Sequence, residues 1–291
     1  MNSFLASHHL LSALLSQTLQ SFFALAVLVA VFAPLEHFFS VRRVGLFHKG
    51  WTVDLGWYFI NGVITIVPLS FLAAFLAAGV HKLLPSGFTE ASAALPLWAR
   101  MCAAMAVGEF GYYWGHRWAH EIPLLWRFHA VHHSAAGVNF LVNTRAHPVD
   151  MIFTRLCMLA PLYAIGLVDT VGPNPSLIPA LVLIVGSVWS FCIHANLRVR
   201  LGLFEEVLTS PAFHHWHHTY EDHKDHNYAT MLPFMDRLFG TFYLPKTWPE
   251  AYGTATPMPD SLIGQLLEPL APTLAPQPVA ESQASYGQRL D

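Results

Sequence analysis

The chain has 291 residues, of which 54% are hydrophobic and 11% are charged, and its net charge is −3. Soluble domains carry about 25% charged residues, so this composition indicates a membrane protein and argues against a soluble one. Basic residues form no patch, which argues against nucleic-acid binding. Cys102, Cys157 and Cys192 lie in apolar stretches without a C-x-x-C partner, so we expect neither a disulfide framework nor a thiolate metal site.

Five apolar segments are long enough, or nearly so, to cross a bilayer. They are 19–39, 55–80, 96–118, 151–168 and 177–195. The N-terminus lacks the basic stretch of a cleavable signal peptide, so the first segment is expected to remain as a span. Asn61, Gly62 and Pro68 predict a kink or break in the second. A turn-rich connector at 169–176 predicts that the last two form a helical hairpin.

The fold expected from these segments is all-α, an integral membrane helical bundle of about four to five spans. Basic residues mark the cytoplasmic side of a membrane protein. Most of them follow the first segment, lie between the third and fourth, or follow the fifth: Arg42, Arg43 and Lys49; Arg117, Arg127, Arg145 and Arg155; Arg198 and Arg200. This bias predicts that the histidine-rich segments form a helical cap on the cytoplasmic face.

Three parts of the chain differ in composition. Residues 1–95 are predicted to hold the N-terminal transmembrane segments, and residues 96–250 hold the histidine motifs. Residues 251–291 are rich in Pro, Ala, Ser and Gln, so this tail is expected to be poorly ordered. Within this tail, a short interfacial helix is predicted at 261–270.

Eight of the chain's eighteen histidines lie in short patterns in the second part, and two single histidines stand between these patterns. One pattern is H-x3-H, and H-x2-H-H occurs twice. The ten are His116, His120, His129, His132, His133, His147, His194, His214, His217 and His218. Imidazole is a common ligand of Fe, Zn, Cu and Ni, and ten are more than one ion needs. On a helix, H-x2-H-H can bind one ion with two histidines and reach a second ion with the third. The patterns therefore predict a di-metal site.

Other polar residues near the motifs are candidates for supporting the ligands. His215, His223 and His226, with Glu221, Asp222, Asp225 and Asp236, are candidate hydrogen-bond partners, because ligand histidines usually need such a partner on the second ring nitrogen. Glu109 lies two helical turns before His116. An intramembrane carboxylate predicts either a functional role or a hydrogen bond to a neighbouring helix, and both interpretations remain open.

These motifs resemble those of the fatty acid hydroxylase/sterol desaturase superfamily, whose members are membrane di-iron oxygenases. The resemblance covers about 109–244. Its matching stretches are Tyr112–His120, Leu125–Ser134, Thr144–Pro148, His194–Asn196, Ser210–His218 and Asn227–Thr241. Two positions depart from the pattern: Glu109 stands where Asp is common, and Ala229 where Gly is usual. Neither departure removes a histidine.

The resemblance implies that all ten histidines bind two iron ions, for which zinc could substitute in isolated protein. It also implies O2-dependent oxidation of a lipid C–H bond, fatty acyl or sterol-like. Glu109, Asn196 and Asp236 are then expected to support the metal ligands. No cytochrome b5 domain is recognisable. Electrons are therefore expected from a separate cytochrome b5, ferredoxin or reductase. Hydroxylation and desaturation share the first hydrogen abstraction, so the motifs fit both, and they fit any oligomeric state.

Three alternatives carry different expectations. A carotenoid hydroxylase uses a related histidine set and would need a long straight apolar channel. A metal transporter or metal-storage protein is a function of another class, and a transporter should place its ligands near the bilayer midplane, whereas these motifs lie at helix ends. A hydrolytic di-zinc enzyme would normally include bridging carboxylates, which the motifs lack.

Overall fold

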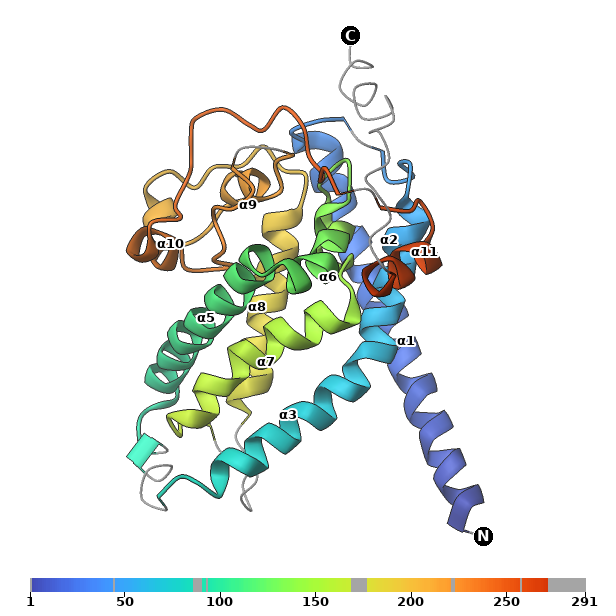
Figure 1. Cartoon of the computed structure of the whole chain (residues 1–291), viewed down its shortest axis with the longest axis vertical. Coiled ribbons are helices and arrows are strands. Elements are labelled where there is room, and N and C mark those ends of the chain that lie inside the picture. The colour runs from blue at the N-terminus through green and yellow to red at the C-terminus, as the bar shows by residue number, and fades with distance from the viewer. Residues whose placement is uncertain are drawn as a thin grey trace.

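The computed structural model describes residues 2–43, 45–85, 91–92, 94–168, 177–220, 223–256 and 258–271, with the backbone alone for 2–11. Regular structure in these ranges is helical, apart from an isolated bridge between Thr219 and Tyr252. The prediction of an all-α fold is thus confirmed. Long helices extend from one end of the molecule, and shorter helices and loops gather at the other (Figure 1).

Two helices among the described residues are long and apolar enough to cross a membrane. One is α1 (Asn2–Phe39), with an apolar window from Ser12. The other is continuous and consists of α2 (Trp51–Phe59), the turn η1 (Ile60–Thr65) and α3 (Ile66–His81). Only 6% and 17% of their apolar windows are buried. Extensive exposed apolar surfaces mark protein or membrane interfaces, and these surfaces fit contact with lipid.

The second long helix widens into π-helical geometry at η1, where the sequence predicts a kink. The amide of Asn61 donates hydrogen bonds to the carbonyls of Thr144 and Ala146, both at 2.9 Å. On the other side of the turn, the amide of Gln17 in α1 donates to the Gly62 carbonyl at 2.9 Å. Wide turns of this kind free backbone carbonyls for outside partners and often occur at functional positions. Here the turn ties α1 to the loop that precedes α7.

Three further helices, α5 (Leu97–Glu121), α7 (Pro148–Ala164) and α8 (Ile178–His194), form a bundle. The backbones of α5 and α7 approach closely at Gly111, where an added Cβ would lie 2.1 Å from the Cys157 carbonyl oxygen. The bundle core includes Met158, Leu159, Leu162 and Val182. These helices occupy the segments predicted as the third to fifth spans. Since α7 and α8 have 17 residues each, fewer than the ~20 of a full span, the number of spans stays a prediction.

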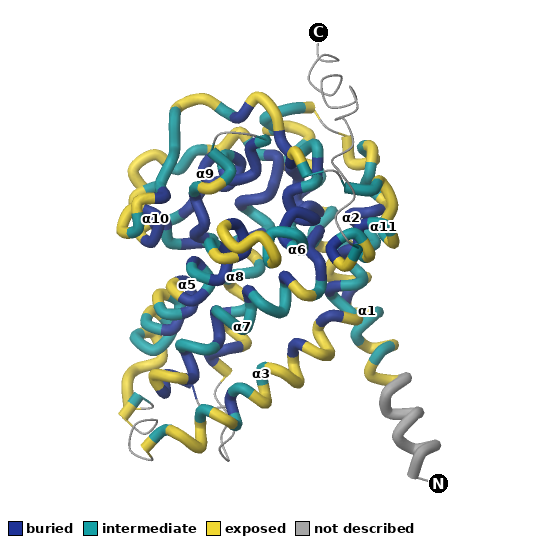
Figure 2. The backbone as a smooth tube through the Cα atoms, in the orientation of Figure 1, coloured by how far each residue is buried: buried dark blue, intermediate teal, exposed yellow. Residues whose placement is uncertain are grey.

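The remaining elements gather at the opposite end of α1 from its N-terminus (Figure 1). They are α6 (Pro123–His133), η2 (Phe140–Thr144), η3 (Gly202–Glu206), α9 (Pro211–His217), α10 (Phe234–Phe239), α11 (Leu262–Leu267) and η4 (Glu268–Leu270). Buried residues concentrate at this end, whereas α1 and α3 are mostly exposed or intermediate (Figure 2). The histidine motifs therefore lie where buried residues concentrate in the part of the chain that the structure describes (Figure 2).

Proline fixes where the histidine-bearing segments become helical. Pro123, Pro148 and Pro211 each occupy the first turn of a helix, where a missing N–H costs nothing and a φ near −65° is already helical. At α9 the Ser210 hydroxyl also accepts a hydrogen bond from the Phe213 N–H at 3.2 Å. These starts set the helical register, and so the direction, of the histidines that follow.

The first part of the C-terminal segment packs against α2. Gln265 of α11 is buried, and its side-chain oxygen accepts a hydrogen bond from the indole N–H of Trp57 at 2.9 Å. The short helix predicted at 261–270 is thus present as α11 and η4. Residues 272–291, on which most of the predicted disorder falls, lie outside the described residues.

Candidate metal centre

Nine of the ten motif histidines converge in two buried groups. The first group comes from α5, α6 and α9, and its ligand atoms lie within 4.8 Å of one another: His116, His120, His129, His133 and His217. The second comes from α6, α8 and the end of α9, with the same limit: His132, His194, His214 and His218. The cap and the bundle together thus create two adjacent clusters of imidazole nitrogen.

Each H-x2-H-H motif is divided between the two groups. In α6, His129 and His133 point to the first group and His132 to the second. In α9 the division is reversed, because His217 joins the first group while His214 and His218 join the second. The helical spacing explains this: residues four apart share a face, and the residue between them is turned toward the neighbouring group.

In the first group, hydrogen bonds on Nδ1 fix which ring nitrogen carries the proton. His116 Nδ1 lies 2.7 Å from the Tyr228 carbonyl oxygen, and His217 Nδ1 lies 2.8 Å from that of His226. His129 Nδ1 lies 3.1 Å from both carboxylate oxygens of Asp150. Oxygens of carbonyls and carboxylates only accept, so Nδ1 must donate in each case. In the neutral ring, Nε2 is therefore left with a free lone pair.

The second group follows the same logic. His132 Nδ1 donates to the Arg145 carbonyl at 3.0 Å, and His194 Nδ1 donates to the Ser190 carbonyl at 2.8 Å. The Nε2 atoms of these two histidines lie 3.2 Å apart. The Nε2 atoms of His116 and His129 show the same separation of 3.2 Å. In each pair two lone pairs face one another without a proton between them, and a shared cation resolves this repulsion.

Several ring nitrogens have no hydrogen-bond partner among the described residues. Both nitrogens of His133 are buried and unpartnered, as are Nε2 of His120 and His217 and Nδ1 of His214. A buried polar atom left without a partner costs about 1–3 kcal/mol. Metal coordination would satisfy one nitrogen of each ligand ring, including Nε2 of His120 and His217, and the opposed lone pairs at once. The donor set is entirely imidazole, so its chemistry fits Fe, Zn, Cu or Ni.

Burial favours the neutral, ligand-competent form of these rings. It lowers the pKa values of His132, His133, His214, His217 and His218 well below their ordinary value, and the neighbouring imidazoles lower them further. A metal competes with protons for imidazole. The site is therefore prepared for metal binding at neutral pH.

His147 lies outside both groups. Its Nδ1 accepts a hydrogen bond from the Val149 N–H at 3.2 Å and caps α7, while Nε2 lies 3.2 Å from the Leu266 carbonyl. Its ring instead packs near Phe128 and Trp57. The geometry gives His147 a structural position between α7 and α11, so of the ten motif histidines it is the one that the structure does not bring to the clusters.

The three histidines predicted as hydrogen-bond partners, His215, His223 and His226, have different roles. His215 is not directed to either group, because Nδ1 bonds the Tyr252 hydroxyl at 2.8 Å and Nε2 bonds the Ala195 carbonyl at 3.0 Å. His226 supports His217 through its backbone carbonyl, and His223 stacks on Tyr243 at 3.7 Å between ring centroids. The carboxylates of Glu221 and Asp222, also considered as partners, lie outside the described residues. Asp225 does contact His120, with 3.1 Å between its carboxylate and Nδ1.

Two of the predicted supporting carboxylates brace the loop after α9. Asp236 accepts from the Tyr228 N–H at 2.8 Å, the Ala229 N–H at 2.9 Å and the Thr241 hydroxyl. Glu109 accepts from the N–H groups of residues 230–232 at 2.6, 2.8 and 3.3 Å. Since the Tyr228 carbonyl fixes His116, Asp236 acts on a histidine through one intervening residue. Burial raises the pKa of Asp236 to about 6.

Among the described residues, Asn196 contacts no metal-ligand histidine through its side chain and instead bonds the residues around the end of α1. Its side-chain oxygen accepts from the N–H groups of Val41 and Arg42 at 3.1 and 3.3 Å, and its amide donates to the Arg42 carbonyl at 2.6 Å. Its own N–H donates to Glu36 at 2.9 Å. Asn196 therefore fastens the end of α8, which carries His194, to the end of α1.

Two supporting contacts are not apparent from the motifs alone. Asp150, the partner of His129, lies in the first turn of α7 and belongs to no histidine pattern. The carbonyl of Arg145, the partner of His132, is held between the two carbonyls that Asn61 binds, and the Arg145 side chain forms a buried ion pair with Asp54 at 3.2 Å. The sequence does contain a signal for Asp150, which is an acidic residue in the first turn of an apolar helix. It contains none for the Arg145 carbonyl, because every residue has a backbone carbonyl.

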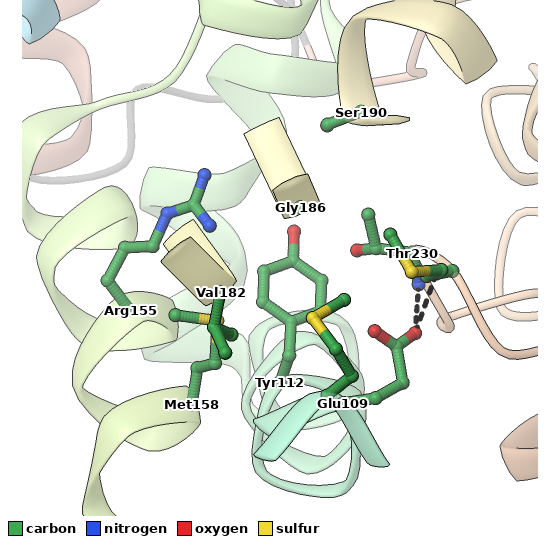
Figure 3. Close-up of a pocket in the computed structure, with 10 residues that line it drawn as sticks. Glu109, Tyr112, Arg155, Met158, Val182, Gly186, Ser190 and Thr230 are labelled. Atoms are coloured by element: carbon green, nitrogen blue, oxygen red, sulfur yellow. Dashed lines mark hydrogen bonds between the residues drawn. The ribbon is translucent and has the colours of Figure 1, made fainter. Parts of the chain in front are cut away.

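Two adjacent cavities that share lining residues extend from the histidines between α5, α7 and α8. The upper one, of about 50 Å³, is lined by His129, His132, His194 and His214 and by polar residues that include Tyr112, Asn143 and Arg155. The lower one, of about 30 Å³, continues to Met105, Met158 and Val182. Tyr112, Arg155, Ser190 and Thr230 line both. Figure 3 shows the lower cavity with the Tyr112 ring at its centre.

Comparison with known proteins connects this geometry to one family. Residues 101–241 match the model of the family described as fatty acid hydroxylase. The chain is 35% identical over 155 residues to the ornithine lipid hydroxylase OlsE of Rhizobium tropici, across 52% of this chain and 44% of the relative. It is 34% identical to human alkylglycerol monooxygenase, across 50% of this chain and 31% of the relative.

A third relative, methylsterol monooxygenase 2-1 of Arabidopsis thaliana, is 28% identical across 52% of this chain and 60% of its own length. The matches to the first two relatives span less than half of those proteins. No solved structure matches the chain.

Proposed function

Because the chain belongs to the fatty acid hydroxylase superfamily, we propose that it is a membrane-bound, O2-dependent di-iron oxidoreductase that hydroxylates a lipid C–H bond. The observation that carries the proposal is the arrangement of paired imidazoles whose Nε2 lone pairs face one another at 3.2 Å in each group. Desaturation of the lipid is the alternative outcome of the same hydrogen abstraction.

The proposed metal ligands are the nine clustered histidines. When bound, two iron ions would supply the electrons that reduce O2 and the oxidant that attacks an unactivated C–H bond. The chain's own contribution begins with orientation. Asp150 and the carbonyls of Tyr228, Arg145 and Ser190 each hold one Nδ1 proton, so the opposite nitrogen of each ring is available. His147 has no place in this ligand set.

The cavity would bring the substrate to the histidines. The two cavities lie between the three helices of the bundle, and the Thr230 loop closes one side. Their linings change from imidazole, through polar side chains, to Met105, Met158 and Val182. An apolar chain would match the side chains at the lower end, since burying apolar surface there is favourable by about 25 cal/mol per Å². The lower cavity, of about 30 Å³, would have to widen to admit the chain. The reacting C–H bond would then lie beside His132, His194 and His214, while the cap excludes bulk water.

The surroundings support a lipid substrate and a cytoplasmic orientation. The exposed apolar faces of α1 and α3 extend to one side of the histidine end, where a bilayer would surround them (Figures 1 and 2). Arg42, Arg127 and Arg198 belong to the opposite, cap end, and basic residues favour the cytoplasmic side. In this orientation a separate cytochrome b5, ferredoxin or reductase would reach the metal centre from the cytosol.

Metal analysis and oxygen uptake test the proposal on the full-length protein in lipid nanodiscs. We expect two iron ions per chain and O2 consumption that requires both a reductant and added lipid extract. Comparative lipidomics of cells with and without the gene should show a lipid that gains one oxygen atom; a lipid that loses two hydrogens would instead indicate desaturation. Metal flux in proteoliposomes without O2 uptake would replace the oxygenase with a transporter.

His132→Ala provides a sharper version of this test. The variant should lose lipid oxidation and part of its iron, because His132 contacts His194 within the second group. Substitution of His215, which is buried nearby but bonded to Tyr252 and Ala195, is the matched control and should retain its iron. Full activity in the His132 variant would remove it from the ligand set.

A further inference from the structure

The cavity walls are arranged in tiers along the helices. On α8, Ser190, Gly186 and Val182 lie four, eight and twelve residues before His194. Each interval of four residues is about 6 Å along the helix axis. All four face the same space. The wall of α8 therefore changes from metal ligand, to hydroxyl, to glycine, to an apolar side chain with increasing distance from the histidines.

The other two helices show the same order. On α5, Tyr112 lies one turn before His116, with 5.5 Å between ring centroids, and Met105 lies two turns further. On α7, Arg155 lies five residues after Asp150, and Met158 lies three residues after Arg155. A polar tier thus stands between the metal ligands and the apolar end, with Arg155 as its only cation among the residues that line the two cavities.

Arg155 lacks a counter-ion in the part of the chain that the structure describes. It is partly buried, and no hydrogen bond or ion pair of its guanidinium occurs among the described residues. The two carboxylates that line the cavities are engaged elsewhere: Glu109 accepts backbone N–H groups at Thr230 and Met231, and Asp150 holds His129.

The same division is visible in the close-up of the cavity. The Tyr112 ring stands between Arg155 and Glu109, its hydroxyl and the guanidinium extend in the same direction, toward Ser190, and the Glu109 carboxylate turns to the Thr230 side (Figure 3). A cation within an apolar bundle is costly unless something compensates its charge. Arginine is also the side chain best suited to bind planar oxyanions through two parallel hydrogen bonds.

We propose that Arg155 and Tyr112 bind an anionic group, a phosphate or a carboxylate, of the lipid substrate. This inference rests on the proposed function and names its substrate class. The apolar chain of the lipid would lie along Met105, Met158 and Val182, and the anion would lie at the polar tier. The oxidised C–H bond would then be within about one helical turn of the anion, roughly 6 Å, on the side that faces the histidines. The substrate is an anionic lipid oxidised at or beside its headgroup.

The hydroxyl groups of the tier fit this assignment. Ser190 donates to the Asn143 side-chain oxygen at 2.5 Å, so the Asn143 amide N–H groups remain available as donors in the upper cavity. The Tyr112 hydroxyl, which also interacts with the Thr230 side chain, and the guanidinium add further donors, and several donors together are the chemistry an oxyanion requires.

The test measures binding without turnover, on the full-length protein in a neutral detergent. Two anionic probes, dioctanoyl phosphatidic acid and N-dodecanoylglycine, are compared with uncharged dioctanoylglycerol and with inorganic phosphate, and tryptophan fluorescence reports the dissociation constants. The wild type should prefer at least one anionic lipid over dioctanoylglycerol. Arg155→Gln should weaken that binding by about 10- to 100-fold, as expected for loss of a charge-assisted hydrogen bond, and leave dioctanoylglycerol binding unchanged.

Two further variants keep the test decisive. Arg198→Gln, at an exposed position outside the cavity, should bind all probes as the wild type does. Arg155→Lys keeps the charge and should lose less affinity for the anionic lipid than Arg155→Gln. It therefore tests the role of the charge if Arg155→Gln folds poorly. Equal binding of charged and uncharged lipids, or unchanged binding in both Arg155 variants, would overturn the proposal. Inorganic phosphate that binds as tightly as phosphatidic acid would assign the site to a free anion.

The outcome can be separated from that of the proposed function. Iron content should be the same in the wild type and in Arg155→Gln, because the guanidinium lines the cavity beside the histidines but forms no hydrogen bond to any of them among the described residues. Anion binding through Arg155 without O2 uptake would contradict only the oxygenase. Oxidation of a neutral lipid at equal rates in wild type and variant would contradict only the anion site.

Discussion

His116 and His129 face each other with their Nε2 atoms 3.2 Å apart, while a backbone carbonyl and a carboxylate hold their Nδ1 protons on the far sides. Two neutral imidazoles arranged in this way repel each other. The relationship is unfavourable for the protein alone and becomes favourable only with a cation between them. It follows that bound metal should contribute to the stability of the fold as well as to chemistry.

His133→Gln tests this coupling. His133 is fully buried and neither ring nitrogen has a partner among the described residues, so glutamine should cost the metal-free protein little. With metal present, the variant should bind fewer ions and unfold at a lower temperature than the wild type. Elemental analysis and thermal unfolding with and without a chelator measure both effects. An equal loss of stability in the chelated protein would indicate that His133 serves packing alone.

Asp150→Asn should weaken metal retention by about 10- to 100-fold, the range found when a partner of a ligand histidine is lost. The amide can no longer accept from His129 Nδ1 through both oxygens as the buried carboxylate does at 3.1 Å. Competition with a graded series of chelators measures the change. Asp225→Asn is the matched control: Asp225 contacts His120 at the same distance, but its side chain is 53% exposed, so water can replace it and the loss should be smaller.

The sequence predicts the parts of this site that depend on helical spacing, and it does not predict the parts that depend on tertiary packing. Spacing predicts that each H-x2-H-H motif divides between two ions. It does not predict that His133, rather than His132, joins His129, because residues three and four apart are both neighbours on a helix. Spacing does not predict that His147 leaves the cluster, since this depends on its capping of Val149 and on the packing of α11. The long apolar helices are likewise visible in composition, whereas the lengths of α7 and α8 depend on where the connecting turns end.

The supporting contacts were predicted in part for the same reason. Asp236 and Glu109 are charged residues inside apolar surroundings, which sequence reveals, and they brace the backbone of residues 228–232. The carbonyl of Arg145 has no sequence signal, because every residue carries one. Its position depends on Asn61, more than eighty residues earlier in the chain, through the π-helical turn of the second long helix.

Acid should destabilise the metal-free protein. Burial lowers the pKa of His215 to about 3, and lowers those of His217 and His218 well below their ordinary value of 6.5. A folded-state pKa below the unfolded value means that the stabilising contribution is complete above about pH 6.5 and is lost as the pH falls. Each such histidine adds up to about 1.4 kcal/mol per pH unit to that slope.

Thermal unfolding of chelator-treated protein between pH 5 and pH 8 measures this slope. His215→Phe should reduce the slope by one titrating group and, because Tyr252 and Ala195 lose their partner, should also lower stability by about 1–3 kcal/mol at pH 8. A midpoint that does not change with pH in the wild type would show that the histidines titrate alike in the folded and unfolded chains.

Gly111→Ala should strongly destabilise the bundle beneath the histidines. The new Cβ would lie 2.1 Å from the Cys157 carbonyl oxygen and 2.8 Å from the Pro161 ring, and backbone atoms of a packed helix cannot yield cheaply. Separation of α5 from α7 would move His116 away from Asp150 and His129, so metal content should fall together with the unfolding temperature. Gly79→Ala in α3 is the matched control, because nothing lies within 4 Å of its added Cβ, and helix propensity should leave that variant as stable as the wild type or up to about 1 kcal/mol more stable. Equal behaviour of the two variants in thermal unfolding and elemental analysis would mean that α5 and α7 do not approach as closely as this packing requires.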